Sequence, residues 1–282
     1  MKIWVTGATG KVGSRFVPRL LQRGHRVTAL VRDAGRAEPL RRMGAEPVEG
    51  DLLEPGGWAD TLQGADTVVH LAAQLHGGVD EATAQRANID ASVILAEAAL
   101  QANVPRFVLA STNLVYGSGS RPAPGREEDE LRPPFTYPRS KVAAEEALLR
   151  LYRERNLGLR ILRLAFVYGE GDPHAVDYLR VMRGWHPAQR LQMIHHADVG
   201  QALLLVASAA GIDGQIYNVA DDAPLTAAEL FRLHGQAVPQ PTEATPALDP
   251  WFMIADTTKI RDELGFRHIF PTFYTARDAG AL

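Results

Sequence analysis

The first sixteen residues read MKIWVTGATGKVGSRF, and this stretch decides the fold. Lys2–Thr6 is apolar enough to predict a buried β-strand, and Val12–Arg23 has the periodicity of an amphipathic helix. Gly24 follows as a helix stop. Three glycines stand between the strand and the helix, which is an unusual use of the most flexible residue.

Glycine at Gly7, Gly10 and Gly13 allows a tight turn, close approach of a ligand and close packing of the helix on the strand. The first helical turn also carries N–H groups and partial positive charge, which would stabilise a pyrophosphate. The spacing G-x-x-G-x-x-G is a variant of the dinucleotide-binding fingerprint. It therefore predicts a dinucleotide site, with a plain glycine-rich turn as the alternative.

Composition restricts the possible classes of protein. The chain has 282 residues and a net charge of −3, which gives no indication of nucleic-acid or membrane-surface binding. No apolar run is long enough for a transmembrane helix, and the N-terminus starts on a strand, so we expect a cytoplasmic protein without a signal peptide. The absence of cysteine excludes disulfides, zinc–thiolate sites and a cysteine nucleophile.

Apolar strands alternate with helices through the first 164 residues. Strands are expected at Arg26–Val31, Glu46–Gly50, Thr67–Ala72, Arg106–Ser111 and Gly158–Leu164, with long helices at Thr83–Ala102 and Pro138–Arg155. Continuous apolar strands separated by helices predict a parallel sheet covered on both faces. The fold class is therefore α/β, a doubly wound parallel Rossmann sheet.

In the C-terminal third the strand and helix patterns are shorter and less regular. We expect residues 1–168 to form the NAD(P)-binding Rossmann domain, with 195–222 returning to it. Residues 169–194 and 223–282 would form a small substrate-binding lid. Within the lid, Thr226 and Glu229 have the spacing of a capping box.

The end of the second strand bears on the choice of dinucleotide. A carboxylate there suits the ribose hydroxyl of NAD, whereas an arginine suits the 2′-phosphate of NADP. The sequence reads Val31, Arg32, Asp33, so Arg32 favours NADP, with Arg36 in support. The alternative is that Arg32 is a surface residue and Asp33 serves NAD.

A tyrosine and a lysine stand four residues apart in YPRSK, at Tyr137 and Lys141. At the start of a helix they share one face, and the ammonium would lower the pKa of the phenol. Tyr137 would then act as an acid or base near neutral pH. The strand Arg106–Ser111 ends in Ser111, Thr112 and Asn113, and its serine and threonine supply hydroxyl groups where such sheets bind ligands.

These residues belong to a collinear set of motifs that resembles the extended short-chain dehydrogenases/reductases of the NAD-dependent epimerase/dehydratase kind. The motifs are TGATGKVG (6–13), GDL (50–52), VVHLAA (68–73), Asn88, ASTNLVYG (110–117), YPRSK (137–141), RLAFVYG (163–169), HADV (196–199) and YNVAD (217–221).

The resemblance implies a role for each matched position. Tyr137 is the acid/base, Lys141 is its partner and ribose ligand, and Thr112 polarises the reacting oxygen. The implied cofactor contacts are Gly7, Thr9, Gly10, Lys11, Val12, Gly13, Arg32, Asp51, Leu52, Leu71, Ala72, Ala73, Asn88, Tyr137, Lys141 and Leu164, where Asn88 also supports the active-site helix. The candidate substrate contacts are Gln74 and His76, which stand just past the fourth strand, together with Asn113 and Phe166.

Two departures from the family pattern affect the expected substrate. Phe166 stands where relatives commonly carry an asparagine that contacts sugar nucleotides. The segment between Gly169 and His196 is also short, which leaves little room for a nucleotide-binding arm. Both favour a small substrate over a nucleotide sugar.

Several other polar residues have a structural interpretation. His195 and His196 are adjacent and lack a third ligand at a suitable spacing, so no metal site is expected. His70 in a buried strand is expected to be a hydrogen-bonded core residue. The acidic run at residues 127–130 is expected to be a solvated loop, with Asp129 or Glu130 at a capping position.

The sequence thus predicts an oxidoreductase that transfers hydride between NADP(H), or NAD, and a carbonyl or alcohol carbon through Thr112, Tyr137 and Lys141. A nucleotide-sugar epimerase or dehydratase with retained NAD is the alternative enzyme. A non-catalytic NADP-sensing regulator is a further alternative. The apolar faces of the helices at 88–102 and 142–155 also lead us to expect a homodimer.

Overall fold

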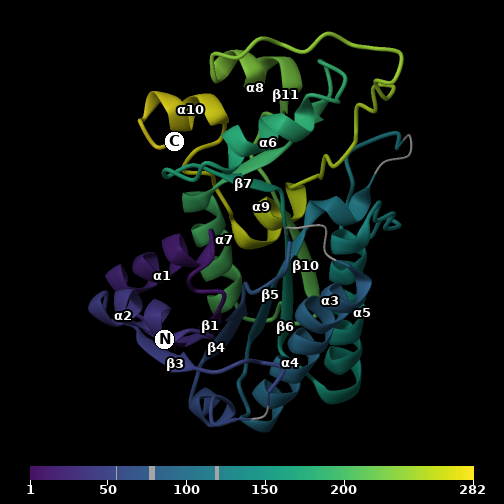
Figure 1. The fold of residues 1–282 in the computed structure, drawn as a ribbon. Helices are drawn as coiled ribbons and strands as arrows, with labels where there is room; N and C mark the ends of the chain where they lie inside the picture. The colour runs from purple at the N-terminus through teal and green to yellow at the C-terminus, as the bar shows by residue number, and fades with distance from the viewer. Residues whose placement is uncertain (55, 76–79, 118–120) are drawn as a thin grey trace. The chain divides into compact units, whose positions relative to one another are not determined.

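The computed structural model describes residues 1–54, 56–75, 80–117 and 121–282 (Figure 1). Its main sheet has seven strands in the order β10-β6-β5-β4-β1-β2-β3. The pairs β1–β2, β1–β4, β2–β3 and β4–β5 are parallel. The strands are β1 (Lys2–Thr6), β2 (Arg26–Val31), β3 (Glu46–Glu49), β4 (Thr67–His70), β5 (Phe107–Thr112), β6 (Leu159–Leu164) and β10 (Gln215–Val219).

Helices cover both faces of this sheet, as a doubly wound fold requires. Helices α1 (Gly13–Gln22) and α2 (Ala34–Arg42) lie along one face, and α4 (Ala91–Gln101) and α5 (Thr136–Arg155) along the other (Figure 1). The expected doubly wound α/β class is confirmed.

The long helix expected over residues 83–102 is divided. It consists of α3 (Glu81–Ala84), a π-helical turn η2 (Gln85–Asp90) and α4. A short 3₁₀ turn, η1 (Ala59–Leu62), precedes β4. A π-helical turn within an α-helix is rare and often occurs at functional sites. This one contains Asn88.

The chain forms two compact units with separate hydrophobic cores. The first comprises residues 1–112, 135–163 and 200–217, and the second 113–134, 164–199 and 218–282. The division differs from the expected one because the segment after β5 is bonded to the C-terminal part of the chain. The Gly125 N–H donates to the Ile254 carbonyl at 2.8 Å, and Asn113 Nδ2 donates to the Met253 carbonyl at 2.6 Å.

The second unit is built from short elements around its own core. They are η3 (Asn113–Tyr116), β7 (Phe166–Tyr168), α6 (His174–Met182), β8 (Arg190–Leu191), β9 (Met193–His195), β11 (Leu225–Thr226), α8 (Ala227–Leu233), α9 (Thr258–Leu264) and α10 (Phe273–Asp278). Helix α7 (His196–Ser208) begins in this unit and continues into the first. The capping box of Thr226 and Glu229 is confirmed.

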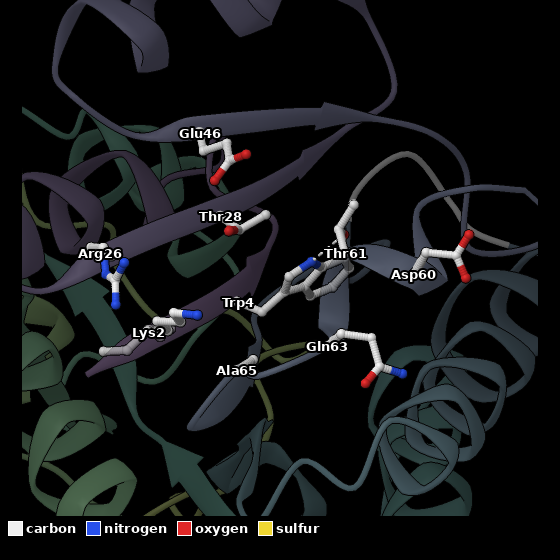
Figure 2. A pocket seen from close by; sticks show the side chains of 10 residues that line it. Lys2, Trp4, Arg26, Thr28, Glu46, Asp60, Thr61, Gln63 and Ala65 are labelled. Carbon is white, nitrogen blue, oxygen red and sulfur yellow. Dashed lines mark hydrogen bonds between the residues drawn. The ribbon is translucent and has the colours of Figure 1, made fainter.

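A pocket of about 310 Å³ lies among the starting halves of the strands of the first unit (Figure 2). Trp4 is buried beneath it and donates through Nε1 to Thr61 Oγ1 at 2.9 Å. Lys2 and Arg26, which are register partners on β1 and β2, line its rim. Because ligands of open α/β sheets bind beyond the carboxyl ends of the strands, this pocket is at the opposite edge from the expected site.

No helix in the described residues is long and apolar enough to cross a bilayer.

Candidate active site

The glycine turn after β1 has the shape that a dinucleotide site needs. Gly7 adopts φ +67°, and a Cβ there would lie 2.7 Å from the Ala72 nitrogen. A Cβ on Gly13 would lie only 2.1 Å from the Gly7 carbonyl oxygen. Gly7 and Gly13 therefore serve the turn and the packing of α1. A Cβ on Gly10 would meet nothing closer than 3.2 Å, which leaves this exposed glycine as the point where a ligand can approach the backbone.

The N-terminus of α1 fits an anionic group. Its N-cap is Val12, without a side-chain cap, and the first turn contains no acidic residue. The exposed Thr9 and half-buried Lys11 lie in the same turn. These residues would hold the pyrophosphate of a dinucleotide, because helix N–H groups and a nearby ammonium both favour negative charge.

Arg32 and Asp33 have different environments at the end of β2. Asp33 is the N-cap of α2, and its Oδ1 accepts from the Gly35 N–H at 2.8 Å. Arg32 and Arg36 are exposed, and neither guanidinium has an ion-pair partner in the described part of the chain. The carboxylate thus has a structural use, whereas both cations remain available to a ligand.

The segment after β3 lies beside the end of β2. The Gly50 N–H donates to the Val31 carbonyl at 3.0 Å, and Asp51 Oδ1 accepts from the Leu53 N–H at 2.9 Å. Leu52 is buried in the core of the first unit. Asp51 is therefore positioned at the sheet edge, while Leu52 already has a packing role.

A chain of hydrogen bonds runs under the end of β4. The N–H groups of Leu71 and Ala72 donate to Thr6 Oγ1 at 3.2 and 3.1 Å, and this hydroxyl contacts His70 Nδ1 at 2.6 Å. His70 Nε2 contacts Ser92 Oγ at 2.9 Å. Burial, with a smaller contribution from Lys141, lowers the pKa of His70 to about 3. The expectation that His70 is a hydrogen-bonded core residue is confirmed. Ala73, the next expected channel residue, is exposed.

Asn88 fastens the π-helical turn to the start of α5. Its Oδ1 accepts from the Gln74 N–H at 2.7 Å, and its Nδ2 donates to the Gln74 carbonyl at 3.1 Å and to Ser140 Oγ at 2.9 Å. Ser140 in turn donates to the Tyr137 carbonyl at 2.7 Å. The implied supporting role of Asn88 therefore has a direct geometric basis.

Tyr137 and Lys141 occupy successive turns of α5, as their spacing predicts. Lys141 is 1% exposed and Tyr137 is half-buried. Burial raises the pKa of Tyr137 to about 12. It lowers the pKa of Lys141 to about 8, although the charge of Glu145 acts to raise it. The expected lowering of the Tyr137 pKa is thus not found in the protein alone, because exclusion of water outweighs any effect of Lys141.

The adjacent hydroxyls at the end of β5 have separate surroundings. Ser111 donates to Glu145 Oε1, and Glu145 also pairs with Arg163, whose Nη2 lies 2.7 Å from Oε2. Ser111 is therefore committed to a buried network. Thr112 lies on the alternate side of the strand from Ser111 and is 7% exposed.

Sequence reasoning missed the pair Glu145–Arg163. Two signals were present: Glu145 follows Lys141 by one further helical turn, and Arg163 is one of two arginines, with Arg160, in a strand whose other residues are apolar. A buried arginine in a central strand requires an anion.

The remaining expected substrate residues are distributed over different parts of the structure. Gln74 is exposed beside Asn88, and His76 lies outside the described residues. Asn113 and Phe166 belong to the second unit, where the Phe166 ring stacks on His174 with centroids 4.1 Å apart. Leu164, an expected cofactor contact, also belongs to this unit. The Asn113 amide is used to hold the Met253 carbonyl.

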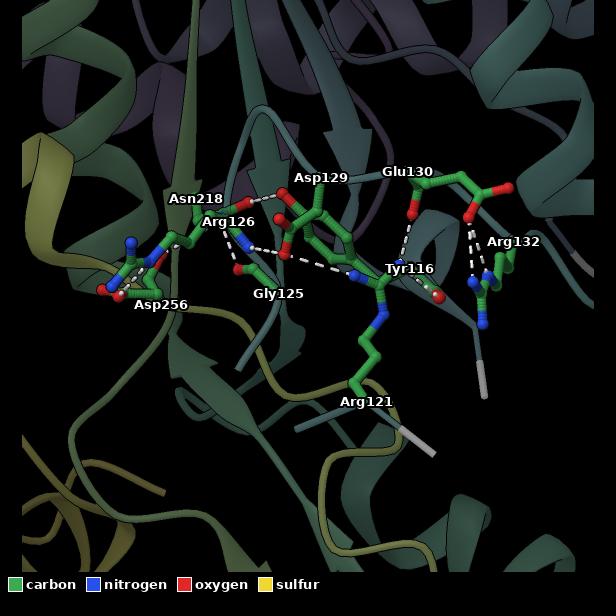
Figure 3. Close-up of polar contacts among 9 residues, drawn as sticks. All are labelled: Tyr116, Arg121, Gly125, Arg126, Asp129, Glu130, Arg132, Asn218 and Asp256. Atoms are coloured by element: carbon green, nitrogen blue, oxygen red, sulfur yellow. Dashed lines mark hydrogen bonds and ion pairs between the residues drawn. The ribbon is translucent and has the colours of Figure 1, made fainter. Parts of the chain in front are cut away.

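The acidic run at residues 127–130 makes contacts within the protein, of which Figure 3 shows those of Asp129 and Glu130. Glu127 Oε1 accepts from the Asn218 N–H at 2.8 Å, and burial raises its pKa. Asp129 Oδ2 accepts from the Arg126 N–H at 2.9 Å and pairs with Arg121 at 3.2 Å. Asp129 therefore has the expected capping role, and the simple solvated-loop expectation is wrong for it and for Glu127.

The two adjacent histidines have separate protein partners. His195 Nε2 lies 2.8 Å from the Ala281 carbonyl, and His196 Nε2 lies 3.0 Å from Asp172 Oδ2. Within the described ranges no group of three or more potential ligands could hold a metal ion.

Comparison with known proteins places this arrangement in a family. The NAD dependent epimerase/dehydratase family matches residues 3–220. The chain belongs to this family. It is thus an enzyme related to the reductases, dehydrogenases and epimerases of the extended short-chain dehydrogenase/reductase type, and the resemblance seen in the sequence motifs is confirmed.

Three similar proteins illustrate the range of the family. The chain is 31% identical to a 4-hydroxy-2-methyl-3-oxo-4-farnesyl-3,4-dihydroquinoline-1-oxide ketoreductase of Stigmatella aurantiaca, over 80% of this chain and 70% of that protein. It is 29% identical to a dTDP-glucose 4,6-dehydratase of Streptomyces antibioticus, over 95% and 88%. A structure of MoeE5 in complex with UDP-glucose and NAD has a TM-score of 0.78 and 28% identity, and each chain is fully covered.

Proposed function

We propose that this enzyme reduces the carbonyl group of a small substrate with NADPH, and that Tyr137 donates the proton. The supporting observation is the placement of Tyr137 and Lys141 on successive turns of α5, which Asn88 and Ser140 fasten at its first turn. With a pKa raised to about 12, the Tyr137 hydroxyl is protonated at neutral pH, as a proton donor must be.

The coenzyme, when bound, supplies the hydride that reduces the carbonyl carbon. In our proposal the Thr112 hydroxyl donates a hydrogen bond to the substrate oxygen, and Tyr137 Oη gives its proton to that oxygen. The product is an alcohol, and the phenolate left behind is stabilised by the Lys141 ammonium. Lys141 would also hold the nicotinamide ribose.

Arg32 supports the proposed preference for NADP. A 2′-phosphate would find two exposed cations at Arg32 and Arg36, whereas Asp33 is already used to cap α2. Arginine binds phosphate through charge-assisted bidentate hydrogen bonds.

Phe166 supports a small carbonyl substrate. Its ring stacks on His174 and lies 4.8 Å from the Tyr178 ring, so this position offers an aromatic surface and no amide for a sugar. The similarity to a ketoreductase agrees with this substrate class.

The test is a screen of aldehydes and ketones for NADPH oxidation, followed by Tyr137→Phe. We expect the variant to lose turnover by at least about two orders of magnitude, since it cannot donate the proton, while NADPH affinity remains near that of the wild type. A fully active Phe variant would exclude Tyr137 as the proton donor.

A nucleotide-sugar epimerase or dehydratase with retained NAD is the second candidate. Similarity to MoeE5 with UDP-glucose and NAD, and to a dTDP-glucose 4,6-dehydratase, favours it. Purified protein that carries NAD, and converts a UDP- or dTDP-sugar without added coenzyme, would identify this activity.

We also propose a homodimer formed through α4 and α5. These helices pack against one another, and Ile94 on α4 is 37% exposed. Light scattering coupled to size-exclusion chromatography measures the mass directly.

A further inference from the structure

We propose that Glu145 is a positioning residue of the reaction, whose carboxylate keeps the ammonium of Lys141 charged inside the protein. The inference rests on the proposed function, in which Lys141 stabilises the Tyr137 phenolate. Arg163 and Ser111 hold Glu145 in place from two strands of the sheet.

Helical spacing places the three side chains in one row. Tyr137, Lys141 and Glu145 follow each other at intervals of four residues on α5, so they occupy neighbouring positions on one face. Lys141 and Glu145 are 1% and 2% exposed. The row therefore runs from the half-buried phenol into the interior.

Glu145 is held by partners from two strands. Arg163 Nη2 lies 2.7 Å from Oε2, and Arg163 Nε lies 3.2 Å from each carboxylate oxygen. Ser111 adds a hydrogen bond to Oε1 from β5. Arginine does not lose its proton in proteins, so the buried Glu145 carboxylate lies against a permanent positive charge.

The groups around Lys141 come from β4, α5 and β6. His70 on β4 is neutral and bonded to Thr6 and Ser92, and Arg163 on β6 lies beyond Glu145. Burial lowers the pKa of Lys141 to about 8, and the Glu145 charge acts in the opposite direction. Without this carboxylate, burial would act on the ammonium unopposed, and Lys141 would lose its proton near neutral pH.

A purely structural role is the competing explanation, since the ion pair also fastens α5 to β6. The two roles differ in what happens when both partners are replaced. A buried ion pair can often be exchanged for neutral residues with little loss of stability, whereas removal of one partner leaves an unpaired charge. A structural role would be restored by the double replacement, but an electrostatic role would not.

The experiment compares Glu145→Gln, the double variant Glu145→Gln/Arg163→Met, and Glu146→Gln as a matched control on the exposed side of α5. Trace acetylation with acetic anhydride over a range of pH, read by mass spectrometry, gives the titration midpoint of Lys141 in the free protein. Lysine occurs only at positions 2, 11, 141 and 259, so the assignment is direct.

We expect the Lys141 midpoint to fall by about one pH unit or more in both Glu145 variants and to stay unchanged in Glu146→Gln. The alkaline limb of kcat should move to lower pH by a similar amount. An unchanged midpoint in the double variant overturns the proposal. A titration midpoint of Lys141 below neutral pH in the wild-type protein would also overturn the proposal, and that measurement requires no variant.

This experiment and the test of the proposed function can fail independently of each other. The acetylation measurement needs neither substrate nor turnover. If Tyr137→Phe remains active, the proposed function fails whatever Lys141 does. If Tyr137→Phe is inactive but the titration midpoint of Lys141 is unchanged in the Glu145 variants, only this inference fails.

Discussion

Asn88 Nδ2 donates a hydrogen bond of 2.9 Å to Ser140 Oγ, and so joins the π-helical turn to the first turn of α5. Both side chains are buried, and Ser140 Oγ in turn donates a hydrogen bond to the Tyr137 carbonyl. The wide π turn of residues 85–90 is therefore coupled to the backbone that carries the proposed proton donor.

We expect Asn88→Ala to lower both stability and turnover. The change removes the hydrogen bonds that Asn88 makes with the Gln74 N–H, the Gln74 carbonyl and the Ser140 hydroxyl, and bonds of this kind contribute about 0.5–1.5 kcal/mol each to stability. Turnover should fall at least about tenfold, since small misplacements of catalytic groups are costly. Thermal unfolding and kcat measure the two effects. Asp90→Asn, at an exterior position of the same turn, is the control. An Asn88→Ala enzyme with normal kcat would contradict the coupling.

The glycine turn provides a prediction about folding and coenzyme binding. A methyl group at position 13 would lie 2.1 Å from the Gly7 oxygen and 2.6 Å from the Ala8 Cα, both of which belong to backbone. Gly13→Ala should therefore displace α1 from β1, lower the unfolding temperature and abolish dinucleotide affinity.

Gly57→Ala is the matched control, because a Cβ there meets nothing within 4 Å. Calorimetry and a coenzyme titration compare the two variants. Normal coenzyme affinity in Gly13→Ala would mean that the turn does not form the coenzyme site.

The N-terminal part of the fold could be predicted from sequence because its signals are local. The apolar strands, the glycine turn and the Tyr137–Lys141 spacing depend on neighbouring residues, and each was found where the pattern places it. Similarly, the capping box at Thr226 depends on a spacing of three residues.

The missed features depend on contacts between distant residues. Glu145 meets Arg163 and Ser111 across 18 and 34 positions, and Asp172 meets His196 across 24. The transfer of residues 113–134 to the second unit rests on contacts with Met253 and Ile254. No periodicity in the sequence encodes such pairings. The π turn within residues 83–102 was also missed.

Arg32 provides a prediction about coenzyme choice. We expect Arg32→Ala to weaken NADP⁺ binding by roughly 10- to 100-fold, the effect of about 1.5–3 kcal/mol from charged hydrogen bonds to phosphate. The NAD⁺ affinity should change by less than about threefold, since NAD lacks the 2′-phosphate. Fluorescence titration with both coenzymes measures the ratio.

Arg42→Ala is the control for a general loss of positive charge, because Arg42 lies on α2 and pairs with Glu38 at 3.3 Å. Equal losses of affinity for both coenzymes in Arg32→Ala would refute the 2′-phosphate contact.

His70 makes stability depend on pH. Its pKa is about 3 in the folded protein and near 6.5 when unfolded, so the unfolded chain binds one more proton between these values. This contribution to stability is fully present above pH 6.5 and is lost as the pH falls toward 3, with a slope of about 1.4 kcal/mol per pH unit.

His70→Asn removes this titration while it keeps a polar side chain near Thr6 and Ser92. The variant will be less stable at pH 7, but its unfolding free energy should fall less steeply between pH 6 and pH 4 than that of the wild type, by about 1.4 kcal/mol per unit. Urea unfolding at several pH values measures the slopes. Parallel slopes would show that His70 already carries a proton in the folded protein. In that case the hydrogen-bond chain from Thr6 through His70 to Ser92 would need a different proton arrangement, with His70 donating from both ring nitrogens.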